Sequence, residues 1–291
     1  MRTGLFIVTG TIACAALAAP LQAKKFGPWS APVNAEVFSG SMGAPNSPQG
    51  DGCPILDPYT NDLYIASTRP GGLGGLDIWI AEWNGNGWDE PVNPGAPVNS
   101  PQNDYCPTPA RGNRLFFVSR RDDPNGDIYV IKRLPKGYGA PQRLPDTVNS
   151  AAEEWSPSWF EKEDGTQVLY FSSTRLNGQQ DIYASENLGP AQPVSSLNTT
   201  FDDARPNVRR DGLEVVFDST RPGGASSAPD IWSASRPSVD AAWSPPVNLT
   251  QLNSPSGESR ASLSWDGKMI VFGSGRDGGE GATDIYVATR D

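Results

Sequence analysis

The chain has 291 residues, a net charge of −10 and no histidine. The acidic balance argues against nucleic acid and anionic membrane surfaces as partners, because their phosphate groups would be repelled. The lack of histidine excludes Ser-His-Asp and Cys-His nucleophiles, histidine-ligated zinc and imidazole acid–base catalysis. With 31 glycines and 28 prolines between strongly apolar runs, the composition is typical of a turn-rich globular protein.

Residues 1–23 have the pattern of a secretory signal peptide. Arg2 supplies a positive charge, residues 5–19 form an apolar run, and Ala23 suits a cleavage site. Cys14 raises the alternative of lipid attachment, which the apolar residues after it disfavour. We therefore expect residues 24–291 to form one domain that is periplasmic or secreted, with no membrane insertion after signal removal.

A unit repeated five times occupies the rest of the chain. Each unit begins with Asn-Ser or Asn-Thr and has an acid five residues after the asparagine, as in Asn46 and Asp51. A short extended segment, a turn, a short apolar run, a Ser-x-Arg, a glycine-bearing loop and an Asp-Ile-aromatic segment follow. Three of the turns carry Asp-Gly, at 164–165, 211–212 and 266–267, and apolar runs of this length between turns indicate buried strands.

A fourth piece of the unit carries a proline three residues after a bulky residue, as in Trp88 and Pro91, and is expected at the outer edge of each sheet. The fifth unit lacks this piece because the chain ends at Asp291, but residues 29–34 match it at the other end. The sequence therefore predicts an all-β fold, a five-bladed β-propeller in which the N-terminal strand completes the C-terminal blade.

The Ser-x-Arg and Asp-Ile-aromatic segments occur in every unit, which favours a structural role over a chemical one. We expect the arginine of the first segment, such as Arg69, to pair with the aspartate of the second, such as Asp77.

Together, the Ser-x-Arg, Asp-Ile-aromatic, Trp-x-x-Pro and Asn-Ser segments resemble the TolB-like (WD-repeat-like) β-propeller repeat over residues 26–291. The resemblance implies an exported bacterial protein. Many members of that family are binding modules, some are fused to peptidoglycan-binding domains, and a minority are lyases or peptidases. This chain differs in having five units where TolB resembles a six-bladed ring, and in lacking the histidines of the related pectic lyases.

The acids that begin the units are the first candidate site, because equivalent positions place them at one height around the ring: Asp51, Asp104, Glu154, Asp203 and Glu258. Arg205 and Arg260 follow the last two acids at two-residue spacing and are expected to share their face. The remaining acids, Asp51, Asp104 and Glu154, are candidate ligands for Ca²⁺. Alternatively, each carboxylate caps its own turn. The loop 122–127 is also rich in oxygen ligands but lacks the terminal glutamate of a calcium loop.

Residues that interrupt the repeat form the second candidate site. Tyr105 and Trp155 stand where other units have small residues, and Glu153 doubles the acid of the third unit. Aromatic rings beside carboxylates suit sugars or cationic ligands, although packing between blades is an equal alternative. Cys53 and Cys106 are equivalent in neighbouring units, and they form a disulfide if their Cα atoms lie within about 7 Å.

From these patterns we expect a non-catalytic exported module that binds a glycan, a peptide or a cell-envelope protein at the ring mouth. No catalytic residue and no certain cofactor is predicted. The alternative is a carboxylate-dependent carbohydrate-active enzyme, a glycoside hydrolase or a lyase. A carboxylate with a raised pKa inside a deep cleft would favour the enzyme.

Overall fold

The computed structural model describes residues 26–39 and 45–291. The predicted signal peptide, with Cys14, lies outside the described residues. Within the described residues, no helix is both long enough and apolar enough to cross a membrane.

Five antiparallel sheets make up the fold, and each corresponds to one repeat unit. Each sheet is called a blade and is numbered in chain order. Blade 1 contains β2 (Asp51–Leu56), β3 (Leu63–Ser67) and β4 (Asp77–Ala81). Blade 2 contains β5 (Asp104–Ala110), β6 (Arg114–Ser119), β7 (Asp127–Lys132) and β8 (Gln142–Arg143). Blade 3 contains β9 (Glu154–Glu161), β10 (Gln167–Ser173), β11 (Asp181–Glu186) and β12 (Gln192–Pro193).

Blade 4 contains β13 (Asp203–Val208), β14 (Glu214–Ser219), β15 (Asp230–Ser235) and β16 (Val247–Asn248). Blade 5 contains β17 (Glu258–Leu263), β18 (Met269–Ser274), β19 (Asp284–Thr289) and the N-terminal β1 (Val33–Asn34). A short helix, α1 (Ala35–Ser39), follows β1.

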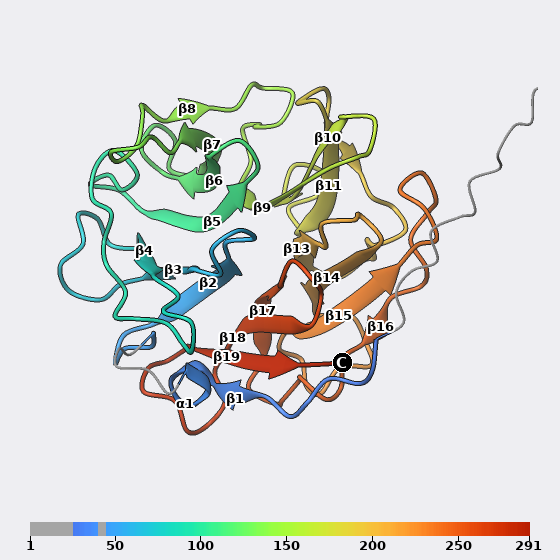
Figure 1. The fold of residues 1–291 in the computed structure, drawn as a ribbon. Helices are drawn as coiled ribbons and strands as arrows, with labels where there is room; N and C mark the ends of the chain where they lie inside the picture. The colour runs from blue at the N-terminus through green and yellow to red at the C-terminus, as the bar shows by residue number, and fades with distance from the viewer. Residues whose placement is uncertain (1–25, 40–44) are drawn as a thin grey trace, which may run out of the picture.

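The blades stand around a common axis, with β2, β5, β9, β13 and β17 innermost (Figure 1). Each inner strand contacts the inner strands of both neighbouring blades, and β17 of blade 5 contacts β2 of blade 1. The ring is therefore closed, and the prediction of a five-bladed β-propeller is confirmed.

The closure joins the two ends of the described chain. Val33 pairs with Val287 and Asn34 with Tyr286, so that β1 becomes the outer strand of blade 5. The Ser30 backbone N–H donates to the Thr289 carbonyl at 2.7 Å. Trp29 is buried in the core of this blade. The predicted completion of the last blade by residues 29–34 is confirmed.

Outer strands are short because proline cannot donate to a strand ladder. Those of blades 2 to 5 have two residues each. In blade 1 the predicted fourth strand is reduced to a single bridge between Val92 and Ile80, next to Pro91. The predicted Asp-Gly turns are present, since Gly165, Gly212 and Gly267 all have positive φ values of 69° to 86°.

The first asparagine of each unit links its loop to the preceding blade. Asn99, for example, donates to the Ile78 carbonyl and accepts from the Ile78 N–H, both at 2.9 Å. The same pair of bonds joins Asn46 to Ile285, Asn149 to Ile128, Asn198 to Ile182 and Asn253 to Ile231. These bonds fix the height at which every inner strand enters the ring. We call the end where the inner strands begin the upper mouth, and the end where they finish, near Leu56 and Glu161, the lower mouth.

Candidate functional site

The acid at the start of each inner strand is held by an ion pair within its own blade. The Asp51 carboxylate accepts from Ser47 N at 2.7 Å, Ser47 Oγ at 2.8 Å and Arg69 Nη2 at 2.7 Å. Its side chain is fully buried and that of Arg69 is 7% exposed. Equivalent ion pairs are Arg121–Asp104, Arg175–Glu154, Arg221–Asp203 and Arg276–Glu258. We call these five arrangements the clamps.

The clamps correct one prediction, that Arg69 pairs with Asp77. In the ladder Ser67 lies between the two acids, opposite Asp51 on one side and Asp77 on the other. The arginine two residues later turns to the inner acid. Asp77 instead accepts N–H groups of its own loop, including that of Gly74 at 3.0 Å.

Because of the clamps, the five predicted ring carboxylates do not face one another as free groups. Each caps its own turn through the serine or threonine four residues before it. The candidate metal ligands Asp51, Asp104 and Glu154 are each paired with an arginine. Among the described residues, no group of three or more acids or cysteines is arranged to hold a metal ion.

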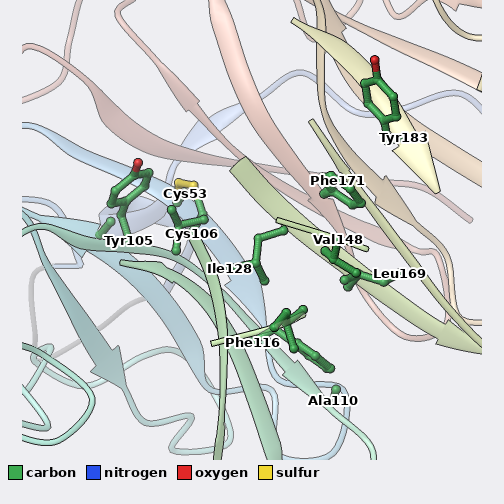
Figure 2. Packing of buried hydrophobic residues seen from close by; sticks show 13 residues of the cluster. Cys53, Tyr105, Cys106, Ala110, Phe116, Ile128, Val148, Leu169, Phe171 and Tyr183 are labelled. Carbon is green, nitrogen blue, oxygen red and sulfur yellow. A yellow bond between two sulfur atoms is a disulfide. The ribbon is translucent and has the colours of Figure 1, made fainter. Parts of the chain in front are cut away.

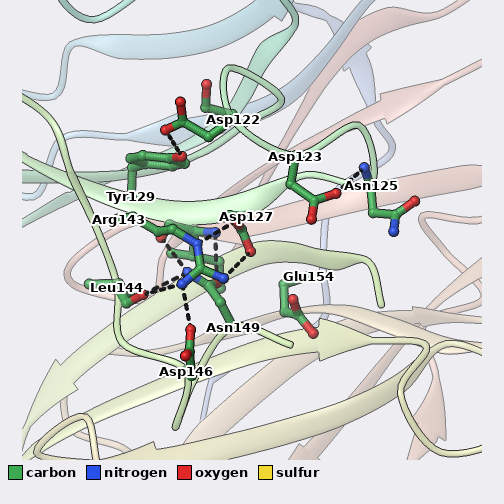
Figure 3. A network of polar contacts seen from close by, with 12 residues as sticks. Asp122, Asp123, Asn125, Asp127, Tyr129, Arg143, Leu144, Asp146, Asn149 and Glu154 are labelled. Carbon is green, nitrogen blue, oxygen red and sulfur yellow. Dashed lines mark hydrogen bonds and ion pairs between the residues drawn. The ribbon is translucent and has the colours of Figure 1, made fainter. Parts of the chain in front are cut away.

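The carboxylates of the oxygen-rich loop 122–127 likewise bind neighbouring protein groups (Figure 3). Asp122 accepts from the Tyr129 hydroxyl at 2.6 Å, and Asp123 accepts from the Asn125 N–H at 2.8 Å. Asp127 is bound by Arg143 at 2.6 Å, and the same guanidinium reaches Asp146. These carboxylates therefore stabilise the loop itself.

In each blade, the residue two positions after the clamped acid has a left-handed backbone conformation. Its φ values are 47° to 59°, at Cys53, Cys106, Ser156, Arg205 and Arg260. In every blade the register between the first two strands shifts at this residue, which marks a β-bulge. A bulge re-aims the side chain of the extra residue. All five side chains line a narrow cavity of about 30 Å³ on the ring axis.

The side chains of these five left-handed residues close the ring axis, and we call them the plug. Cys53 and Cys106 form a disulfide between blades 1 and 2, with their Cα atoms 4.9 Å apart. On the opposite side, Arg205 Nη1 pairs with the Asp218 carboxylate, which also accepts the Arg260 backbone N–H at 3.0 Å. The Asp218 carboxylate thus binds the guanidinium of Arg205 and the backbone of Arg260.

A cavity of about 240 Å³ lies above this plug, at the upper mouth. We call it the upper cavity. It is lined by two aromatic residues, Tyr105 and Trp155, and by three arginines, Arg120, Arg205 and Arg260. Figure 2 shows Tyr105 beside the Cys53–Cys106 bridge. The predicted residues Tyr105, Trp155, Arg205 and Arg260 are thus brought together, whereas the ring acids do not line this cavity.

Guanidinium groups lie over the two aromatic rings of the upper cavity. The Arg120 guanidinium carbon lies 5.9 Å from the centre of the Tyr105 ring, and that of Arg205 lies 5.6 Å from the Trp155 ring. The predicted site residue Glu153 is at the rim, with its carboxylate 3.8 Å from Arg120. Gly52 stands where blades 2 and 3 have Tyr105 and Trp155. A Cβ there would lie 2.8 Å from Arg260 Nη1, so glycine leaves room for this guanidinium.

Positive charge exceeds negative charge around the upper cavity. Burial and the charge of Arg205 lower the pKa of Arg260 to about 10, against the opposing effect of Asp218. Burial raises the pKa of Asp218 in spite of Arg205. Burial also raises the pKa of Tyr105, although Arg120 and Arg260 act in the opposite direction.

Several buried donors beside the upper cavity have no hydrogen-bond partner among the described residues. They are the Nε atoms of Arg120, Arg205 and Arg260, the indole Nε1 of Trp155 and the hydroxyl of Tyr105. Buried donors are usually paired, and unpaired ones cost free energy. The arrangement therefore favours an anionic ligand, whose charge would offset the surplus of guanidinium groups.

Sequence reasoning missed two members of this site, Arg120 and Asp218. Arg120 replaces the threonine or glycine found inside the other Ser-x-Arg segments. Asp218 occupies a strand position that is Ala66, Val118, Ser172 or Gly273 in the other blades. Both break the repeat, and a search for charged residues at otherwise neutral repeat positions would have found them.

No protein-family model and no curated protein matches the sequence. Solved structures do match. A thermostable family-43 glycoside hydrolase has 16% identity and a TM-score of 0.55, with 84% of this chain and 89% of that chain covered. An α-L-arabinofuranosidase from Lactobacillus brevis has 14% identity and a TM-score of 0.54, with 89% and 94% covered. TolB from Acinetobacter baumannii has 16% identity and a TM-score of 0.48, with 84% of this chain covered, and the chain spans 55% of its length.

These matches contradict the prediction of a non-catalytic binding module, because the solved structures that share the fold include glycoside hydrolases. At such identities the likeness establishes the fold, a five-bladed β-propeller.

Proposed function

We propose that this protein is a carbohydrate-active enzyme whose substrate is an acidic glycan bound in the upper cavity. The observation that carries the proposal is the surplus of guanidinium groups beside two aromatic rings, Tyr105 and Trp155. An aromatic ring stacks on the apolar face of a sugar, and a guanidinium binds a carboxylate through two parallel hydrogen bonds. A uronic acid residue presents both features.

The charges at the upper mouth favour elimination over hydrolysis. A glycoside hydrolase of the common type requires two carboxylates beside the scissile bond. At this mouth the five ring acids are buried in clamps, and Asp218 is paired with Arg205. Elimination from a uronate requires cations that stabilise charge on the substrate carboxylate and a group that moves one proton. The arginines of the upper cavity supply the cations, and Tyr105, whose buried hydroxyl has no hydrogen-bond partner among the described residues, is the candidate for the proton transfer.

In the proposed step, Arg120 and Arg260 bind the uronate carboxylate, and Tyr105 moves the proton. The Tyr105 phenolate takes the proton from the carbon α to the carboxylate. The released electron pair forms a carbon–carbon double bond as the β-carbon–oxygen bond of the glycosidic link breaks. The leaving oxygen takes the proton back from the Tyr105 hydroxyl, so atoms and charge balance. A tyrosine suits this role because the chain has no histidine.

Location in the periplasm or outside the cell is part of the proposal. The Cys53–Cys106 disulfide supports it, because disulfides persist in oxidising compartments. Acidic polysaccharides of cell walls and biofilms are accessible there.

The test is incubation of the protein with polygalacturonate and with alginate, followed by ultraviolet absorbance of the unsaturated uronide product. We expect activity on an acidic glycan and a loss of at least about a hundredfold in Tyr105→Phe. Tyr129→Phe is the matched control in the same blade, because the Tyr129 hydroxyl is bonded to Asp122 outside the cavity. Cleavage that yields saturated reducing ends and survives Tyr105→Phe would contradict the proposal.

A further inference from the structure

A second cavity, of about 330 Å³, lies at the lower mouth, where the inner strands end. We call it the lower cavity. The narrow plug on the axis, with its 30 Å³ of free volume, separates it from the upper cavity. The two cavities share no lining residue. The lower cavity is therefore an independent site, to which the proposed function assigns no role.

Four aromatic side chains line the lower cavity: Tyr59, Trp159, Phe160 and Trp265. Tyr59 is 58% exposed, and its ring centre lies 5.6 Å from that of Trp265 at an angle of 47°. The Arg210 guanidinium lies 3.4 Å from the Trp265 ring centre, and that of Arg114 lies 4.8 Å from the Trp159 ring centre. Guanidinium packing of this kind holds each indole ring in a fixed plane.

Polar groups accompany the rings on the cavity wall. The Ser262 hydroxyl is on a side chain that is 3% exposed, and it has no hydrogen-bond partner among the described residues. The Trp159 indole N–H also has no hydrogen-bond partner among the described residues. The Glu161 carboxylate, 26% exposed, is held 3.1 Å from Arg111. A ligand that fits has an apolar face for the rings and an edge of hydroxyl groups for these polar atoms.

The lower cavity is lined by two arginines, Arg111 and Arg210, and by one acid, Glu161, which is paired with Arg111. A groove of about 850 Å³ adjoins the cavity through Arg111, Glu161, Arg210 and Trp265, and six acids and four basic residues line this groove. Two of the basic side chains are already paired: Arg209 binds Asp211 and Glu214, and Lys162 binds Glu186 and Asp240. The surplus of acids in this groove would weaken the binding of an acidic glycan that extended into it from the lower cavity.

We infer that the lower cavity is a second carbohydrate site, specific for a neutral sugar ring. The sugar stacks on Tyr59 and Trp265 and bonds with its hydroxyls to Trp159 Nε1, Ser262 Oγ and the Glu161 carboxylate. The site holds a neutral glycan segment on the face of the ring opposite the upper cavity.

The test is binding of cellotriose, xylotriose and arabinotriose to the mature protein, measured by calorimetry and by the indole N–H resonances in NMR spectra. We expect one of these sugars to bind and to shift the Trp159 indole resonance. Tyr59→Ala and Trp265→Ala should each raise its Kd about tenfold. Phe201→Ala is the matched control, because Phe201 is an aromatic residue that is 41% exposed and lines neither cavity.

The outcome is independent of the elimination proposal. Binding that is unchanged in Tyr105→Phe but weakened in Tyr59→Ala supports the second site whether or not the upper cavity is active. Absence of binding by all three sugars, or binding that Tyr59→Ala and Trp265→Ala leave unchanged, overturns the inference. Binding of a galacturonate trimer that Trp265→Ala weakens overturns the neutral specificity.

Discussion

Replacement of Arg69 by methionine tests the hypothesis that the buried ion pairs of the clamps stabilise the fold. The substitution keeps most of the apolar stem and removes the guanidinium. The Asp51 carboxylate, with a side chain that is 0% exposed, then keeps only the N–H and hydroxyl of Ser47. Breaking a buried pair so that one charge remains costs about 3–5 kcal/mol. We therefore expect the free energy of unfolding to fall by about 3 kcal/mol or more.

Arg111→Met is the matched control. The Arg111–Glu161 pair has the same chemistry, but its side chains are 69% and 26% exposed. Exposed pairs contribute about 0–1 kcal/mol. Urea unfolding at equilibrium, followed by tryptophan fluorescence, compares the two variants directly.

A double-mutant cycle isolates the pair itself. Asp51→Asn alone leaves Arg69 buried without its carboxylate, and the double variant removes both charges. The loss of unfolding free energy in the double variant should be smaller than the sum of the losses in the two single variants by about 1 kcal/mol or more. The reasoning fails if the free energies of unfolding of Arg69→Met and Arg111→Met differ by less than about 1 kcal/mol. The buried pair would then contribute no more to stability than a surface pair.

Three further outcomes follow from the fold and the upper cavity. Trp29→Ala should lower the free energy of unfolding by about 3–5 kcal/mol and lower the midpoint of thermal unfolding. Val37→Ala, at a side chain that is 77% exposed, should leave the midpoint unchanged. Equal midpoints in the two variants would refute closure by the N-terminal strand. Cys53→Ser with Cys106→Ser should cost up to about 4 kcal/mol by the chain-entropy estimate, and thiol titration of the unreduced, unfolded mature chain should find neither cysteine free. Since burial raises the pKa of Tyr105 and its phenolate is the active form, kcat/KM for an acidic glycan should rise about tenfold per pH unit below that pKa; a flat profile would exclude Tyr105 as the base.

Repetition made the architecture predictable. Short apolar runs between turns gave the strands, and the match of residues 29–34 to the missing last piece gave the closure. The residues at the upper cavity were also accessible, since Tyr105 and Trp155 break the repeat where other units have small side chains.

Local pairing within a blade was not predictable from the same pattern. Ser67 stands between two acids in the ladder, and sequence spacing alone does not decide which of them Arg69 approaches. For the same reason the charge of the ring was misjudged. The ring acids looked like a cluster because their clamping arginines follow the second strand of the blade, 17 to 21 residues away in sequence. The bulge was missed too, because Cys53 and Arg260 are not residues that sequence alone associates with positive φ.

The bulged position has an evolutionary consequence. Its backbone conformation is the same in all five blades, yet its side chain is a disulfide-bonded cysteine in two blades, a serine in one and an arginine in two. The identity of the residue is thus uncoupled from the geometry that presents it. Substitutions at these five positions can change the side chains around the narrow axial cavity without changing the surrounding strands. Proteins that share this fold can therefore differ in the ligand they bind while keeping the same backbone.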